Sequence, residues 1–186
     1  PEGGESDLTD RIAEGLLIAT RDAGRRAIAD PRDYEARATL MWAGSVSHND
    51  YTGCGRKRLF PVHKLEHELS AFRDEIAHGA GLSVLFPAWA EHEMQYDYPR
   101  FAQFANRVLG VEMDFEHPER TAREGIRTLR RFFEEIGMPT HLSQLSIKPE
   151  NYEKLAANTV RTVNGPVKSY SPLDEKAIIE IYRLAE

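Results

Sequence analysis

The sequence has one cysteine, no long apolar run and no extended basic cluster, and each absence excludes a class of protein. Cys54, the single cysteine, cannot form an internal disulfide, which is consistent with a reducing compartment. No apolar run is long enough to span a bilayer, and residues 1–10 are acidic and polar rather than a signal sequence. We therefore expect a soluble, cytoplasmic protein without a membrane partner.

The charge of the chain argues against a nucleic-acid partner. Its formal net charge is -6 at pH 7, whereas proteins that bind duplexes usually carry a clustered basic surface. Short basic runs occur at residues 25–26, 56–58 and 130–131. Runs of this length are typical of solvated faces, so we expect no nucleic-acid partner.

What the sequence does contain is the composition and periodicity of a single helical domain. It has 186 residues, of which 41% are hydrophobic and 29% charged, as in ordinary globular proteins. Apolar positions recur at helical spacing and no strand, repeat or linker is predicted, so we expect an all-α, bundle-like fold of seven or eight helices. The predicted helices are 6–29, 34–48, a segment that follows a loop at 51–60, and then 79–94, 98–109, 118–136 and 146–163. A last helix is predicted from residue 172 or 173 to 184.

One predicted helix is expected to lie at the centre of the bundle. The run from Leu82 to Ala90 is apolar on nearly all sides, which is typical of a buried helix. Pro87 is expected to kink it. Trp42 and Trp89 are expected to fill core positions, because tryptophan more often packs in a core than recognises a ligand.

The most informative feature is a group of three histidines, His63, His67 and His78. Positions i and i+4 lie one turn apart on a helix, so His63 and His67 can direct their imidazoles at one point. Gly79 and Gly81 follow His78 and allow the chain to turn, so a helical hairpin could bring His78 beside them. Neutral imidazoles suit Zn²⁺ or Fe²⁺, and the spacing alone nominates all three as ligands. Surface or core histidines without a metal are the commoner outcome of such spacing.

The residues around the histidines narrow the metal chemistry. The H-E-x-x-H motif of zinc proteases needs Glu directly after its first histidine, but a lysine follows His63, and Ala71 stands four residues after His67. A zinc-protease function is therefore excluded by residue identity. Glu66 and Glu68 flank His67, and either could accept a hydrogen bond from a ligand's second nitrogen or form a solvent-exposed salt link.

Four segments share their pattern with a known family. They are residues 8–17 (LTDRIAEGLL), 34–43 (YEARATLMWA), 63–82 and, more loosely, 137–142 (GMPTHL). In this order, across nearly the whole chain, they resemble the iron-containing alcohol dehydrogenase family and, within it, the butanol-dehydrogenase-like branch. The resemblance implies an enzyme that interconverts a primary alcohol and an aldehyde by hydride transfer with NAD(H) or NADP(H).

The resemblance also implies a role for each histidine. In the family, an Asp and a His from one helix and two later histidines hold the metal, and by position His63 and His78 are the two later ligands of Fe²⁺ or Zn²⁺. His67 takes the place of a histidine that does not bind the metal, lies near the nicotinamide and substrate, and can help to move a proton. The resemblance therefore makes His67 the candidate catalytic and cofactor-binding residue. One departure is that the segment between His67 and His78 is a residue longer than the common pattern.

Part of the implied enzyme lies outside the sequence. Residues 1–7 hold no Asp and His pair, and the chain has neither a G-x-G-x-x-G motif nor the family's glycine-rich phosphate loop. The sequence begins with Pro and has roughly half the family's usual length. We therefore expect residues 1–186 to be one helical metal-binding domain, cut from its N-terminal dinucleotide-binding domain, inactive alone and homodimeric when intact.

The remaining candidates concern the pocket and the other histidines. Asn49 and Phe60 are candidates for the wall of a pocket that holds the alcohol or aldehyde. His48 is an equal candidate for that wall and for an exposed helix end, where the helix dipole is favourable. Three further histidines have no partner at ligand spacing and are expected to be structural or surface residues: His92, His117 and His141.

A second hypothesis treats the chain as a standalone helical metal-binding or interaction module without redox activity. It predicts a domain that neither depends on nor complements a nucleotide-binding partner. A glycine-rich phosphate loop and an Asp-x-x-x-His pair encoded upstream of Pro1 would exclude it.

Overall fold

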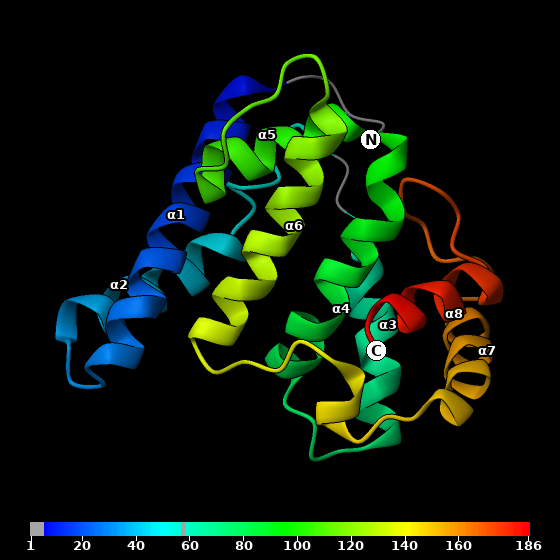
Figure 1. Ribbon diagram of the computed structural model, residues 1–186. Coiled ribbons are helices and arrows are strands. Elements are labelled where there is room, and N and C mark those ends of the chain that lie inside the picture. The colour runs from blue at the N-terminus through cyan, green and yellow to red at the C-terminus, as the bar shows by residue number, and fades with distance from the viewer. Residues whose placement is uncertain (1–5, 57–58) are drawn as a thin grey trace.

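The computed structural model, which describes residues 6–56 and 59–186, is built almost entirely of helices (Figure 1). The described residues contain an isolated β-bridge between Val167 and Leu173 but no strand, so the all-α prediction is confirmed. No helix in this part of the chain is long and apolar enough to cross a membrane. The predicted polar stretch 1–10 and basic run 56–58 lie partly outside the described residues. The α-helices are α1 (Asp7–Ala29), α2 (Tyr34–Ser47), α3 (Pro61–Phe72), α4 (His78–Glu93), α5 (Tyr98–Leu109), α6 (Pro118–Glu135), α7 (Tyr152–Thr162) and α8 (Glu175–Leu184).

Local sequence signals set most helix ends. Ser6 accepts a hydrogen bond from the Thr9 amide at the start of α1, and Asp33 caps α2 in the same way. After α5 and α6 the chain turns at Gly110 and Gly137, with φ of 76° and 77°. Glycine adopts this left-handed conformation at no steric cost, which favours a helix end at both positions.

Helices that follow one another in the sequence pack as pairs. Helix α4 lies at the centre of the fold, where it contacts α3, α6 and α8 (Figure 1). On one side α7 packs against α3 and α8 against α4. On the other side α6, paired with α5, packs against α4, and the α1–α2 hairpin lies at the far edge. Val84, Leu85 and Ala88 of α4 are at most 1% exposed, which confirms the prediction of a central helix. The kink expected at Pro87, inside α4, stays a prediction. The α7–α8 pair therefore packs on both α3 and α4, whereas α6 packs on α4.

The core prediction for Trp42 is wrong. Trp42 is 69% exposed and Met41 80% exposed on the outer face of α2, which packs chiefly against α1. Trp89, by contrast, is partly buried, and its ring lies 5.9 Å from that of Phe101. The helical spacing in α2 is that of a packing face, but the described chain supplies no helix to cover it.

Two predicted helix starts are also wrong. The helix predicted at 146–163 begins later, because Ser146 is left-handed with φ 57° and the chain continues through a 3-10 turn at Pro149–Asn151 before α7. The last helix begins at Glu175 rather than at residue 172 or 173. Asp174 caps it by accepting from the Ala177 amide at 2.9 Å, while the residue before Asp174 forms the β-bridge.

Candidate metal centre

The three histidines meet at the hairpin between α3 and α4. Pro61 is the first residue of α3. His63 and His67 both lie on this helix, four residues and so about one turn apart. The chain leaves the helix at residue 73 and re-enters one at His78, the first residue of α4. This is the helical hairpin expected from the sequence, and it brings the imidazoles of two helices together.

The ring separations test whether the histidines can share an ion. The His78 ring centroid lies 5.2 Å from that of His63 and 5.5 Å from that of His67, while His63 and His67 are 6.4 Å apart. A nitrogen lies about 2 Å from a bound zinc, so two imidazoles on one tetrahedral ion have ring centres about 5 Å apart. Only the two separations that involve His78 match. The geometry therefore favours His78 with one of the two α3 histidines over all three as ligands.

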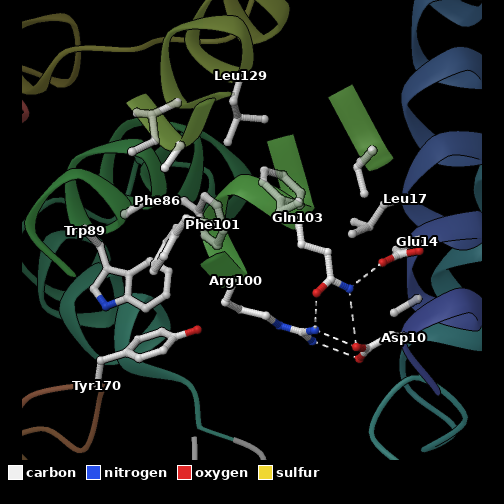
Figure 2. A pocket seen from close by; sticks show the side chains of 16 residues that line it. Asp10, Glu14, Leu17, Phe86, Trp89, Arg100, Phe101, Gln103, Leu129 and Tyr170 are labelled. Atoms are coloured by element: carbon white, nitrogen blue, oxygen red, sulfur yellow. Dashed lines mark hydrogen bonds and ion pairs between the residues drawn. The ribbon is translucent and has the colours of Figure 1, made fainter. Parts of the chain in front are cut away.

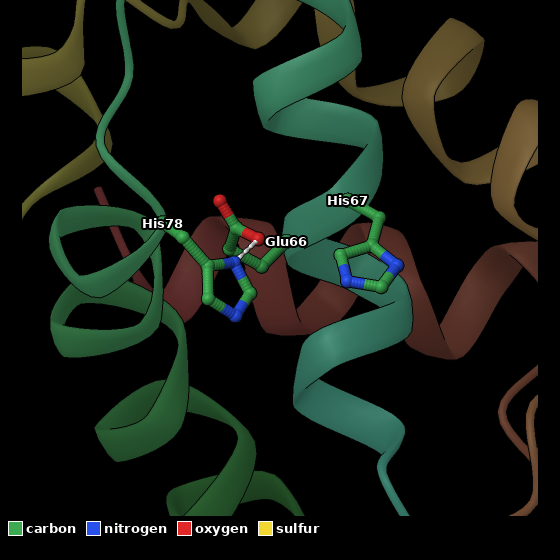
Figure 3. A group of neighbouring side chains, drawn as sticks. All are labelled: Glu66, His67 and His78. Atoms are coloured by element: carbon green, nitrogen blue, oxygen red, sulfur yellow. Dashed lines mark hydrogen bonds and ion pairs between the residues drawn. The ribbon is translucent and has the colours of Figure 1, made fainter. Parts of the chain in front are cut away.

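A fully buried carboxylate completes the cluster (Figure 3). Glu66 on α3 is 0% exposed, its Oε2 is hydrogen-bonded to Nδ1 of His78, and its Oε1 accepts a hydrogen bond from the hydroxyl of Ser70 at 2.5 Å. One nitrogen or oxygen atom from each of Glu66, His67 and His78 lies within 4.8 Å of the others. Imidazole nitrogens and carboxylate oxygens are donors that Zn²⁺ and Fe²⁺ accept in proteins, so these residues fit such an ion.

The second glutamate of this segment points elsewhere. Glu68 accepts a hydrogen bond from the Thr162 hydroxyl of α7 at 3.0 Å. The structure therefore separates two residues that the sequence left equivalent: Glu66 contacts a candidate ligand, and Glu68 links α3 to α7.

The electrostatic environment of His63 favours its neutral form. Burial lowers the pKa of His63 below its ordinary value of 6.5, and the neighbouring His78 and His67 lower it further. A neutral imidazole keeps the lone pair that a metal ion needs. His63 is therefore ready to bind an ion at neutral pH.

An apolar cavity of about 700 Å³ lies beside His63. Five helices supply its walls, which include Phe60, Leu82 and Phe132, and the Phe60 ring meets the His63 ring edge-on with centroids 5.2 Å apart. Phe60 thus lies where a pocket wall was expected, whereas Asn49 is exposed and lies outside this cavity. No sequence signal points to the cavity, because its walls come from segments far apart in the chain.

The other histidines have local partners. His48 is exposed at the end of α2, with Nδ1 2.9 Å from the Gly44 carbonyl oxygen. The remaining three pair with side chains or backbone near them: His92 with Glu93 and Glu180, His117 with Glu119, and His141 with the backbone of Glu186. The structure brings none of these three into the α3–α4 cluster, in agreement with the sequence prediction.

A second, smaller cavity of about 210 Å³ lies between α1, α4, α5 and α6 (Figure 2). On one side Asp10 accepts hydrogen bonds from Arg100 at 2.5 and 2.9 Å and from Arg56 at 2.6 Å. The hydrogen bond and charge of Arg100 hold the pKa of Asp10 at about 2. On the other side the rings of Trp89 and Tyr170 lie 6.1 Å apart. Asp10 forms ion pairs with both Arg56 and Arg100, and the Asp10–Arg100 ion pair links α1 to α5. We call these three residues the α1–α5 clamp.

Comparisons with known proteins identify relatives that match nearly the whole chain. The model of the Fe-containing alcohol dehydrogenase family, C-terminal, matches residues 4–185. NADH-dependent butanol dehydrogenase A of Clostridium acetobutylicum is 35% identical over 177 residues, which cover 95% of this chain and 45% of that protein. NADPH-dependent aldehyde reductase YqhD of Escherichia coli is 31% identical over 143 residues, which cover 77% of this chain and 36% of that protein. The chain thus spans less than half the length of these relatives.

A solved structure shows the same arrangement of helices. The crystal structure of NADH-dependent butanol dehydrogenase A from Thermotoga maritima superposes with a TM-score of 0.92 at 30% sequence identity. The match covers 99% of this chain and 47% of that chain. The similarity therefore extends over the whole of the present fold and over about half of the larger structure.

Proposed function

The chain belongs to the Fe-containing alcohol dehydrogenase family, whose C-terminal part it matches, and from this premise we propose that it is the helical metal-binding domain of an NAD(P)-linked alcohol dehydrogenase. The proposed reaction interconverts a primary alcohol and an aldehyde by hydride transfer. The observation that carries the proposal is the convergence of His63, His67 and His78 beside an apolar cavity.

We assign the metal to His63 and His78. Their ring separation of 5.2 Å suits a shared tetrahedral ion, and burial keeps His63 neutral. Bound Fe²⁺ or Zn²⁺ would supply Lewis-acid polarisation of the aldehyde oxygen. His67 is exposed one turn along α3, where it is free to give a proton to the substrate oxygen or to take one from it.

The cavity beside His63 is larger than a short alcohol needs. A volume of about 700 Å³ is that of a pocket for a drug-sized molecule. We propose that its end next to Phe60 and His63 holds the alkyl part of the alcohol. Apolar side chains from the part of the protein outside this chain would then cover the remaining volume of the cavity.

An exposed apolar stripe on α2 supports the proposal that a further domain packs on this chain. Tyr34, Met41 and Trp42 are between 69% and 80% exposed and recur at helical spacing, and apolar patches of this kind mark protein contacts. The relatives named above are more than twice as long as the part that matches. We propose that a domain that binds NAD(H) or NADP(H) precedes this chain, supplies the remaining ligands and packs on this helical unit.

The test uses the protein expressed from its full gene. Metal content and butanal-dependent oxidation of NADH and NADPH are measured for the wild type, for His63→Ala, for His78→Ala and for a control, His117→Ala, which changes an exposed histidine at the start of α6. We expect both cluster variants to lose metal and most turnover while the control keeps both. Full metal content and turnover in His63→Ala would refute the ligand assignment. A gene without a dinucleotide-binding domain would favour a standalone module.

A further inference from the structure

We propose that Glu66 is a positioning residue that fixes the orientation of His78, so that Nε2 of His78 faces the metal and Glu66 itself is not a ligand. This inference rests on the metal site proposed above and assigns a residue that the histidine pattern does not include. It also decides between two uses of the same carboxylate, since Glu66 lies close enough to His67 and His78 to be taken for a ligand.

The hydrogen bonds determine which nitrogen of His78 is free. Nδ1 of His78 is hydrogen-bonded to Oε2 of Glu66, so Nε2 is the ring nitrogen left for an ion. We infer that the carboxylate is the acceptor and that Nδ1 carries the proton. In the neutral ring, Nε2 then holds the lone pair. A ligand histidine whose second nitrogen donates to a carboxylate is a common arrangement in metal sites, and the carboxylate raises the basicity of the ligand.

Burial argues against Glu66 as a ligand. Glu66 is 0% exposed, and its oxygens already accept from His78 and Ser70. The His78 side chain, by contrast, is 47% exposed, and His67 is also exposed. An ion that reaches the cluster from solvent therefore meets the imidazoles first, while the buried carboxylate lies against Nδ1 of His78 (Figure 3).

Two neighbours hold the carboxylate in this position. Ser70, one turn after Glu66 on α3, donates to Oε1, and Gly81 on α4 leaves the space that the side chain fills. A Cβ on Gly81 would lie 2.5 Å from Cγ and 2.7 Å from Oε1 of Glu66. The carboxylate is thus enclosed between two helices, which restricts its rotation. Glu68, two residues away, has no such enclosure and is the matched control.

The first measurement reports the His78 tautomer without any metal. Long-range ¹⁵N–¹H spectra of the 186-residue chain at pH 8 should show His78 protonated at Nδ1. Glu66→Leu removes the acceptor and should release this tautomer, whereas Glu68→Gln should leave it unchanged. Ser70→Ala, a milder change that keeps the carboxylate, should weaken the preference for Nδ1 and covers the case in which Glu66→Leu does not fold.

The second measurement is zinc affinity by chelator competition in the full-length protein. Loss of a carboxylate that supports a ligand typically lowers metal affinity 10–100-fold. We expect a loss of about that size in Glu66→Gln, whose neutral amide keeps an acceptor but not the charge, and unchanged affinity in Glu68→Gln.

The outcomes separate this inference from the proposed function. Wild-type His78 protonated at Nε2, or Glu66→Gln that binds zinc as tightly as Glu68→Gln, would overturn the positioning role. Full-length wild-type protein that binds no zinc would instead refute the proposed metal site, and the tautomer spectra would still decide whether Glu66 orients His78.

Discussion

Gly81 and Glu66 face each other where α4 crosses α3, and no side chain fits between them. A Cβ on Gly81 would lie 2.5 Å from Cγ of Glu66, well inside ordinary contact distance. The close approach of the two helices and the burial of the carboxylate therefore depend on the same glycine. Since His78 begins α4, the geometry of the candidate metal site depends on it as well.

Gly81→Ala should destabilise the chain by about 1–3 kcal/mol, because the added methyl group must displace Glu66 or move α4. Urea denaturation measures the free energy of unfolding. The control is Gly15→Ala in α1, where nothing lies within 4 Å of the new Cβ, and helix propensity predicts a gain of about 0.5–1 kcal/mol. Equal effects at the two positions would contradict the packing described for Gly81.

The Asp10 cluster predicts acid sensitivity. Asp10 is held in its ionised form by Arg100 and Arg56, with a pKa of about 2 against an ordinary value of 3.8. Because the folded-state pKa is the lower one, the stabilisation is complete above about pH 4 and is lost as the pH falls toward 2. Its size is on the order of 2 kcal/mol.

Asp10→Asn should therefore lower stability at pH 7 and flatten the dependence of stability on pH between 4 and 2. Urea denaturation at several pH values measures both effects. Asp74→Asn, at an exposed position between α3 and α4, should change stability by less than about 0.5 kcal/mol. An unaltered pH dependence in Asp10→Asn would mean that the ion pairs of the α1–α5 clamp do not form in solution.

Replacing the two tryptophans by alanine should lower the stability of the chain by very different amounts. Trp89 packs against Phe101 and donates its indole N–H to Ser169 at 2.9 Å, so Trp89→Ala should cost about 3 kcal/mol. Trp42→Ala should cost less than about 0.5 kcal/mol in the 186-residue chain, because Trp42 is 69% exposed. In the full-length protein the cost of Trp42→Ala should rise, since the proposed further domain covers α2. A constant, small cost in both proteins would argue against that contact.

His67→Ala separates proton transfer from metal binding. If His67 is not a ligand, the variant should keep its metal and lose about 10²–10⁴-fold in kcat, the usual contribution of a general acid or base. His63→Ala should lose the metal itself. Metal content and kcat of the two full-length variants check this, and loss of metal in His67→Ala would make His67 the ligand in place of His63.

The helices and the histidine hairpin could be predicted because their signals are local. In the structure, the caps at Ser6 and Asp33 and the left-handed Gly137 each lie within one turn of the helix end that they set. The convergence of His63 and His78 needed only a break and a reversal between two helices. Family resemblance then added what spacing could not, namely a different role for His67.

The remaining features depend on packing between distant segments. Glu66 and Glu68 are two positions apart and so point to nearly opposite sides of α3, but only the placement of α4 and α7 decides which of them meets His78. Trp42 shows the reverse case, in which an apolar helical pattern has no partner in the described chain. The cavity beside His63 requires five helices at once, so no single segment could reveal it.

The proposed metal site takes two ligands from this chain, His63 and His78, and the others from the rest of the protein. The direct test is the zinc and ferrous-iron affinity and stoichiometry of the isolated chain and of the full-length protein, each with and without the pair of changes His63→Ala and His78→Ala. The expected result is weak binding by the isolated chain, because ligand number and geometry set affinity, and one tightly bound equivalent in the full-length protein that the double variant loses. Tight binding of one equivalent by the isolated chain, or metal retained in the full-length double variant, would contradict it.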